Sequence, residues 1–180
     1  MTKIKFIGKF IPIIFLTTFC FLLLSACSLK SFKSQVEPIF YFESKFCVSN
    51  QGNLIEGKLN VEKDSSVKLE ITSPTQIKDL TFLKSNKETS ISFKGLKLKS
   101  HDKIFPESSF ITFLFEILES IKSKNNYNLI SSDETVSSFV GKCNILDFEL
   151  KIENESGFIK EIKLPKENLT FTLSEHKNKT

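Results

Sequence analysis

The sequence contains no arginine and no tryptophan, and only two histidines and six glycines occur among its 180 residues. Lysine therefore supplies all 25 basic side chains, and no guanidinium is available to bind a phosphate through two parallel hydrogen bonds. The glycines form no phosphate-cradling loop, and the common hydrolase and metalloprotease motifs are missing. His101 and His176 are isolated, so neither a catalytic triad nor a zinc site is expected. These absences argue against an enzyme and against a bound metal or cofactor.

The positive charge of the chain is concentrated at its start. The formal net charge is +4, and Lys3, Lys5 and Lys9 all precede a long apolar segment. Without these three lysines the chain is close to neutral. A nucleic-acid-binding protein needs a basic stripe, so we expect no nucleic-acid partner.

The apolar segment Phe10–Leu24 ends in Leu24-Ser25-Ala26-Cys27. A basic head, an apolar middle and small residues are typical of a secretory signal peptide, and the segment is short for a spanning helix, which needs about 20 residues. The four residues resemble the lipobox of bacterial lipoproteins. That resemblance implies that the Cys27 sulfur receives a diacylglyceryl group, with acyl chains such as palmitate, and that cleavage before Cys27 removes residues 1–26. An uncleaved anchor helix is the alternative.

These signals predict the location and the domain organisation. Two acyl chains suffice for stable anchoring, so the protein is expected on the extracytoplasmic side of the cell membrane, held by its lipid. We expect residues 1–26 to be the signal peptide, residues 27–37 a lipidated tether and residues 38–176 a single folded domain. The last residues, His176 to Thr180, are expected to be a polar tail that begins where the domain ends.

Cysteine usage leaves two thiols in the expected domain. Cys20 leaves with the signal peptide, Cys27 is lipidated, and Cys47 and Cys143 remain. Export favours a disulfide, and both residues are assigned to the outward face of their strands. An intramolecular bond would stabilise the fold by about 4 kcal/mol in the chain-entropy model. Two free thiols, or a bond between two chains, are the alternatives.

Alternating apolar and polar residues predict antiparallel strands through most of the domain. In the first one, Phe40, Phe42, Phe46 and Val48 share one face. Turn residues separate the runs, and Ser73-Pro74 ends the third because proline cannot continue a ladder. The predicted strands are residues 40–48, 54–62, 67–72, 80–83, 90–93, 96–99, 129–130, 136–140, 144–152, 158–164 and 169–173.

One helix interrupts the strands. Pro106-Glu107-Ser108-Ser109 marks its start, since proline is tolerated in a first turn. Apolar residues then cover most of its circumference from Phe110 to Ile121. Such a helix is buried on most sides. We interpret it as part of the core, with a gate over a ligand as the alternative. The fold class is therefore mainly β (α+β): a curved antiparallel half-barrel sheet with one buried helix plugging its concave side.

A lipobox, a curved sheet and an apolar plug helix together resemble the LolA/LolB-like half-barrel family. The runs at residues 73–82 and 91–96 are also similar to GerS-type germination lipoproteins of sporulating bacteria. The first resemblance implies a carrier whose concave face holds a lipid or another hydrophobic ligand. The aromatic residues assigned to line that face are Phe40, Phe42, Phe46, Phe82, Phe93, Phe113, Phe148 and Phe171.

The second resemblance implies a non-enzymatic protein that binds an envelope partner, a cell-wall amidase that modifies spore-cortex peptidoglycan. The two hypotheses differ in what they predict for the concave face. A partner-binding module has a cavity filled by its own side chains, whereas a carrier has an open cavity lined by phenylalanine.

Overall fold

The computed structural model describes residues 36–50, 52–86, 88–100, 105–106, 109–123 and 126–178. Within them the chain forms one antiparallel sheet, one α-helix and one short 3-10 helix. The helices are α2 (Phe110–Lys122) and η2 (Thr75–Ile77). The strands are β1 (Phe42–Asn50), β2 (Asn53–Val61), β3 (Val67–Ser73), β4 (Thr81–Lys84), β5 (Thr89–Phe93), β6 (Leu96–Ser100), β7 (Tyr127–Ser132), β8 (Val136–Cys143), β9 (Leu146–Glu153), β10 (Ile159–Leu164) and β11 (Leu169–Asn178).

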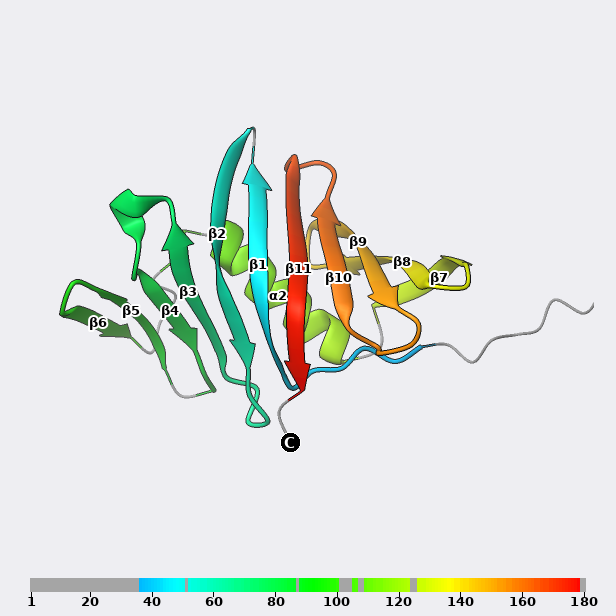
Figure 1. Cartoon of the computed structure of the whole chain (residues 1–180), viewed down its shortest axis with the longest axis horizontal. Helices are drawn as coiled ribbons and strands as arrows, with labels where there is room; N and C mark the ends of the chain where they lie inside the picture. Colours follow the sequence, from blue (N-terminus) through cyan, green and yellow to red (C-terminus); the bar gives the residue numbers. More distant parts are fainter. Residues whose placement is uncertain are drawn as a thin grey trace, which may run out of the picture. The chain divides into compact units, whose positions relative to one another are not determined.

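The strand order in the sheet is β6-β5-β4-β3-β2-β1-β11-β10-β9-β8-β7. Successive hairpins build each half of the sheet, and the two halves meet where β1 pairs with β11. The sheet curves around α2 and stays open, so β6 and β7 are its two edges (Figure 1). The predicted curved antiparallel sheet with one helix on its concave side is confirmed.

Alternation of side chains fixes which face of the sheet is buried. On β9, Leu146, Phe148, Leu150 and Ile152 are buried while the residues between them are more exposed. On β1, Phe42, Phe46 and Val48 are buried in the same way. The buried faces of the strands join in one core beneath α2. Burial of apolar area is the main favourable term in folding, and here it selects the concave face.

Helix α2 begins at the end of the stretch 106–109 that the sequence predicts as its start. Its first residue is Phe110, and the preceding Ser109 is the N-cap, with its side-chain oxygen accepting a hydrogen bond from the Thr112 amide at 3.2 Å. Ser109 is the N-cap because its hydroxyl can accept a hydrogen bond from a backbone amide that the first turn leaves unpaired. Proline has no side-chain acceptor for this bond. The expectation that the helix is buried on most sides is confirmed by residues Ile111, Leu114, Phe115, Ile117, Leu118, Ser120 and Ile121.

The expected placement of Cys143 is wrong. Strand β8 extends through Cys143, so alternation from the buried Phe139 turns the thiol inward, where it donates to the Glu116 carbonyl oxygen at 3.4 Å. Cys47 lies on the opposite face, and both cysteines are free thiols. Three strands separate β1 from β8. Neighbouring strands lie about 4.8 Å apart, so the Cα atoms of Cys47 and Cys143 are farther apart than the roughly 7 Å that a disulfide spans. The intramolecular bond is therefore incompatible with this fold.

The polar tail also differs from the expectation. Strand β11 continues to Asn178, and the His176 ring stacks on Phe158 with ring centroids 4.4 Å apart. The pairing of β1 with β11 contains a register shift, and Glu175 has a positive φ of 50°. Together they change the side of the sheet on which the following side chains lie. His176 thereby packs inward instead of continuing as a solvated tail.

The expected signal peptide, Cys27 and the tether up to residue 35 lie outside the described residues. Among the residues that are described, no helix is long and apolar enough to cross a membrane.

Candidate functional site

The concave face, where the sequence places a ligand, is filled by the protein's own side chains. Five of its eight predicted lining residues are 7% exposed or less: Phe42, Phe46, Phe82, Phe148 and Phe171. Phe40 and Phe113 are partly buried and pack against this core. Phe93 lies outside that cluster, with the Lys94 ammonium 5.0 Å from its ring centroid.

Aromatic contacts show how α2 closes the face. The Phe110 ring lies 6.4 Å from that of Phe171 on the central strand β11. Phe105, in the segment that leads into the helix, contacts both Phe82 at 5.5 Å and Phe115 at 6.1 Å. Edge-on and tilted contacts at these separations are favourable. The phenylalanines therefore form a packed core rather than the wall of an open cavity.

A small pocket remains at one end of α2. Its volume is about 160 Å³, and it lies where the helix meets the β2–β3 turn, the β4–β5 turn and the segment before β1. The apolar part of the lining is Phe40, Val61, Val67, Phe115 and Leu118, and the polar part is Tyr41, Glu62, Ser65, Lys84, Ser85, Asn86, Glu119 and Lys122. Of the predicted lining residues, only Phe40 reaches this pocket.

Polar contacts cross the pocket from the helix to the two turns. The Lys84 ammonium lies 3.0 Å from a Glu119 carboxylate oxygen and 6.0 Å from the centroid of the Phe115 ring. The Lys122 ammonium donates to the Ser65 hydroxyl. Glu119 is 75% exposed, so its ion pair contributes at most about 1 kcal/mol. These contacts order the mouth of the pocket more than they stabilise the fold.

The size of the pocket limits what it can hold. A buried cavity of about 150 Å³ accommodates a molecule such as benzene, whereas sites for larger ligands enclose roughly 300–1,000 Å³. The pocket therefore fits one ring or a short aliphatic segment, and it is too small for the acyl chains of a lipid. Its described lining contains no histidine and no cysteine to act as a nucleophile or general base.

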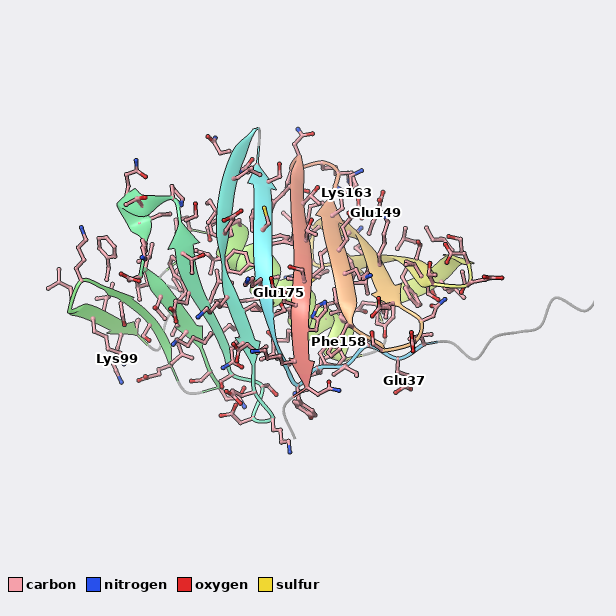
Figure 2. The ribbon with its side chains drawn as sticks, viewed as in Figure 1. Glu37, Lys99, Glu149, Phe158, Lys163 and Glu175 are labelled. Atoms are coloured by element: carbon pink, nitrogen blue, oxygen red, sulfur yellow. The ribbon has the colours of Figure 1, made fainter. Side chains whose placement is uncertain are left out.

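A second, shallower depression lies over β8 and β9, with a volume of about 490 Å³. It is lined mainly by polar and charged residues, including Glu149, which Figure 2 labels on β9. At its rim, Lys166 forms an ion pair with Asp147 and keeps the pKa of that carboxyl below its usual value, chiefly through its hydrogen bond. Charges held in exposed pairs are typical of a solvated face.

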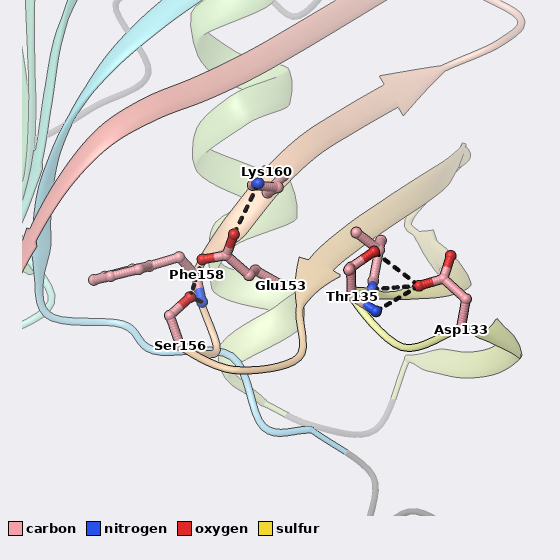
Figure 3. A network of polar contacts seen from close by, with 7 residues as sticks. Asp133, Thr135, Glu153, Ser156, Phe158 and Lys160 are labelled. Carbon is pink, nitrogen blue, oxygen red and sulfur yellow. Dashed lines mark hydrogen bonds and ion pairs between the residues drawn. The ribbon is translucent and has the colours of Figure 1, made fainter.

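Near the start of β10, polar contacts fix two turns (Figure 3). Lys160 pairs with Glu153 at 2.8 Å, and the Ser156 hydroxyl donates to the same carboxylate at 2.6 Å. In the β7–β8 turn, an Asp133 oxygen accepts from the Thr135 amide at 2.7 Å. Each contact satisfies backbone or side-chain groups of a turn, so the network is structural. Among the described residues, no group of three histidine, cysteine or acidic side chains is placed to hold a metal ion.

Sequence reasoning missed most of the pocket. Phe115 and Leu118 belong to the predicted apolar stripe of the helix, with no separate role, and Lys84 lies just beyond the predicted strand 80–83 and was given no role. The signal that could have found them is the break in the stripe at Glu119, directly after the apolar Ile117 and Leu118. The two turns that complete the pocket are far apart in sequence, and periodicity does not bring them together.

No protein-family model and no curated protein matches the chain. Among solved structures, an uncharacterized conserved protein from Thermus thermophilus is similar with a TM-score of 0.53 at 10% identity, over 77% of this chain and 78% of that one. MucB aligns with a TM-score of 0.49 at 15% identity, over 81% of this chain and 55% of its own. A LolA superfamily protein from Nitrosomonas europaea aligns with a TM-score of 0.39 at 6% identity, over 80% and 87%. The likeness to the Thermus protein shows a shared fold.

Proposed function

We propose that this chain is a lipoprotein anchored through Cys27 on the extracytoplasmic side of the cell membrane, and that its β-sheet domain is a non-enzymatic module for binding a protein partner. The lipobox and the basic, apolar leader support the anchor. The domain follows the leader after a short tether, so the anchor would hold it close to the membrane surface.

The filled concave face is the observation that carries the partner-binding role. Opening that face for a lipid would expose the five buried phenylalanines that were predicted to line it, at about 1.5–3 kcal/mol for each side chain. The sum is comparable to the whole stability of an ordinary domain, about 5–15 kcal/mol. A ligand would have to restore all of that burial, whereas a partner protein can bind the outer surfaces and leave the core closed.

The similarity of residues 73–82 and 91–96 to GerS-type lipoproteins suggests the class of partner. By that likeness, the partner is a cell-wall amidase that acts on spore-cortex peptidoglycan during germination. In this proposal the lipoprotein holds or activates the amidase at the membrane and performs no chemistry itself.

The second candidate function is transport of a small hydrophobic ligand. The pocket beside Phe40 and Phe115 favours it, because that pocket is partly apolar and has room for one ring or a short chain. Under this hypothesis the ligand is much smaller than a phospholipid.

Native mass spectrometry of the full-length lipoprotein, released from its own membranes in mild detergent, separates the two functions. Under the partner proposal, the complex gains the mass of a second protein, and the purified lipoprotein alone leaves peptidoglycan intact. Bare lipoprotein in every preparation would contradict that proposal.

Under the carrier hypothesis, the chain instead carries a small added mass. That mass should disappear in Phe40→Asp, which alters the pocket, and persist in Phe93→Asp, which alters another partly buried phenylalanine outside it. Retention of the added mass in both variants would exclude the pocket as its site.

A further inference from the structure

The edge strand β6 exposes two large apolar side chains. Leu96 is 78% exposed and Leu98 is 59% exposed. Among the described residues β6 pairs with β5 alone. The backbone groups on its outer side therefore have no strand beside them in this part of the chain, and an edge of this kind is a template for another strand.

The exposed leucines continue the apolar face of the core. In the strand register, Phe82 on β4 is opposite Ile91 on β5, which is opposite Leu98 on β6. Phe93 is likewise opposite Leu96. Exposure increases along the first row from 7% at Phe82 to 59% at Leu98. The apolar layer thus extends past the region that α2 covers and ends at the edge of the sheet.

The opposite face of β6 is basic. Lys97 and Lys99 alternate with the two leucines, and Figure 2 labels Lys99 on this strand. Lys99 forms an ion pair with Glu88 at 2.8 Å, and Lys94 lies in the turn before β6. If β6 paired with the β6 of a second copy, these lysines would face lysines, and like charges opposite each other destabilise a sheet. The charge pattern therefore disfavours a second copy of this chain.

We propose that β6 is the docking edge for an extended strand of the protein partner, in which apolar and acidic residues alternate. The apolar side chains would cover Leu96 and Leu98, and the acidic ones would lie opposite Lys97 and Lys99. Main-chain hydrogen bonds supply affinity in such strand addition, and alternate side chains supply specificity. This inference rests on the proposed function, since it describes how that partner binds.

The other edge provides a comparison. Strand β7 reads Tyr127-Asn128-Leu129-Ile130-Ser131-Ser132 and carries no charged side chain. It exposes apolar residues to a similar degree, with Ile130 at 61%. Because β7 has no charge that selects a partner, a comparison of binding at β6 and at β7 distinguishes the contribution of exposed apolar residues from the contribution of the lysines.

The test uses the full-length lipoprotein in detergent micelles and a capped peptide in which valine and glutamate alternate. A matched peptide alternates valine and lysine. Hydrogen exchange of the backbone amides locates binding, and fluorescence anisotropy measures affinity. The acidic peptide is expected to slow exchange in residues 96–100, and the basic peptide is expected to bind at least about fivefold more weakly.

Variants make the result specific. Leu98→Asp should abolish the protection of β6, whereas the matched change Ile130→Asp on β7, at nearly equal exposure, should leave it intact. Lys97→Glu should reverse the preference, so that the basic peptide binds more tightly than the acidic one. A reversal also shows that this variant is folded.

Several outcomes would overturn the proposal: equal binding of the two peptides, protection of β7 in place of β6, or no protection at all. Protection of β6 by anionic lipid vesicles without any peptide would assign this edge to the bilayer instead. A partner that co-purifies equally with wild type and with Leu98→Asp would overturn the docking edge while leaving the proposed function intact. The absence of any co-purifying protein would count against the function itself.

Discussion

At the scale of single residues, Gly57 shows how closely the concave face is packed. It is buried on β2, and a Cβ atom added there would meet the Glu70 carbonyl oxygen and the Phe46 ring. The Glu70 oxygen belongs to the backbone of the neighbouring strand β3, so it cannot move aside as an exposed side chain can. We expect Gly57→Ala to lower the free energy of unfolding by about 1–3 kcal/mol.

Chemical denaturation measures that loss, with Glu56→Ala as the control because Glu56 is exposed and next in the chain. The control should stay within about 0.5 kcal/mol of wild type. Equal stability of Gly57→Ala and wild type would show that the two neighbouring groups can separate at little cost.

His176 gives the fold a dependence on pH. Its ring stacks on Phe158 and contacts Phe42 edge-on at 5.9 Å, and neither ring nitrogen has a hydrogen-bond partner. Burial is the main cause that lowers the pKa of this imidazole. The nearby Glu153 carboxylate raises the pKa, and the Lys160 ammonium lowers it. Because the unfolded chain binds the proton more readily, stability is complete above the unfolded pKa of about 6.5 and is lost as the pH falls below it.

We expect His176→Phe to keep the stacking and to remove this loss of stability. The measurement is the denaturation midpoint of both proteins between pH 5 and pH 7.5, a range in which Glu153 stays ionised because Lys160 and Ser156 lower its pKa. Parallel curves for the two proteins would show that His176 is not the titrating group.

His176 and Cys143 mark where sequence reasoning reached its limit. The alternation of β1 and β9 could be read directly, because every second side chain is apolar in β9 and, apart from Ser44, from Phe42 to Val48 in β1. His176 could not be placed, because the irregular pairing near Glu175 changes the register in a run of polar residues. Cys143 was misplaced for a related reason: Gly141 conceals the alternation between Phe139 and Cys143, so the strand was predicted to end early.

At the scale of elements, α2 depends on its first turn. The Ser109 hydroxyl accepts from the Thr112 amide and also lies 2.9 Å from the Thr112 hydroxyl. Replacement of an N-cap serine by alanine costs about 1 kcal/mol, so Ser109→Ala should lower the stability of the domain by that amount. Thermal unfolding measures the change.

Ser109→Asp is the matched variant, because an aspartate also caps amides and its charge is favourable at a helix N-terminus. It should retain most of the wild-type stability. If alanine and aspartate were equally destabilising, the hydrogen bond at Ser109 would not be the cause.

The elements themselves were largely predictable, but the pocket between them was not. Apolar residues at helical spacing identified α2, and turns rich in glycine, asparagine and serine separated the strands. The pocket instead forms from α2 together with turns that contain Ser65 and Asn86. Their proximity follows from the strand order, which single-sequence periodicity does not provide.

At the scale of the whole molecule, the proposed lipid anchor would decide where the domain works. The thiol of Cys27 is the expected site of lipid attachment, and serine cannot replace it as the acceptor. We expect Cys27→Ser to accumulate as an uncleaved precursor that keeps residues 1–26. Mass spectrometry of the membrane fraction measures the mass of the precursor and the absence of the diacylglyceryl group.

Cys20→Ser is the control, since Cys20 lies inside the expected signal peptide and should leave processing unchanged. A Cys27→Ser protein of the same mature mass as wild type, retained on membranes to the same extent, would contradict the lipoprotein assignment. The proposed partner-binding role would then need a different explanation of where the domain is located.

The pairing of β1 with β11 places the two ends of the domain at the centre of the sheet, with Phe42 opposite Asn178. If the chain is exported from its N-terminal end, as proposed, β1 to β10 would cross the membrane before β11, which pairs with β1 and β10. Until residues 169–178 arrive, β1 and β10 each leave an open edge and the core lacks Phe171. Contacts between residues so distant in sequence slow folding. If the chain is exported as proposed, we therefore expect it to cross the membrane unfolded, with β11 completing the sheet only after translocation.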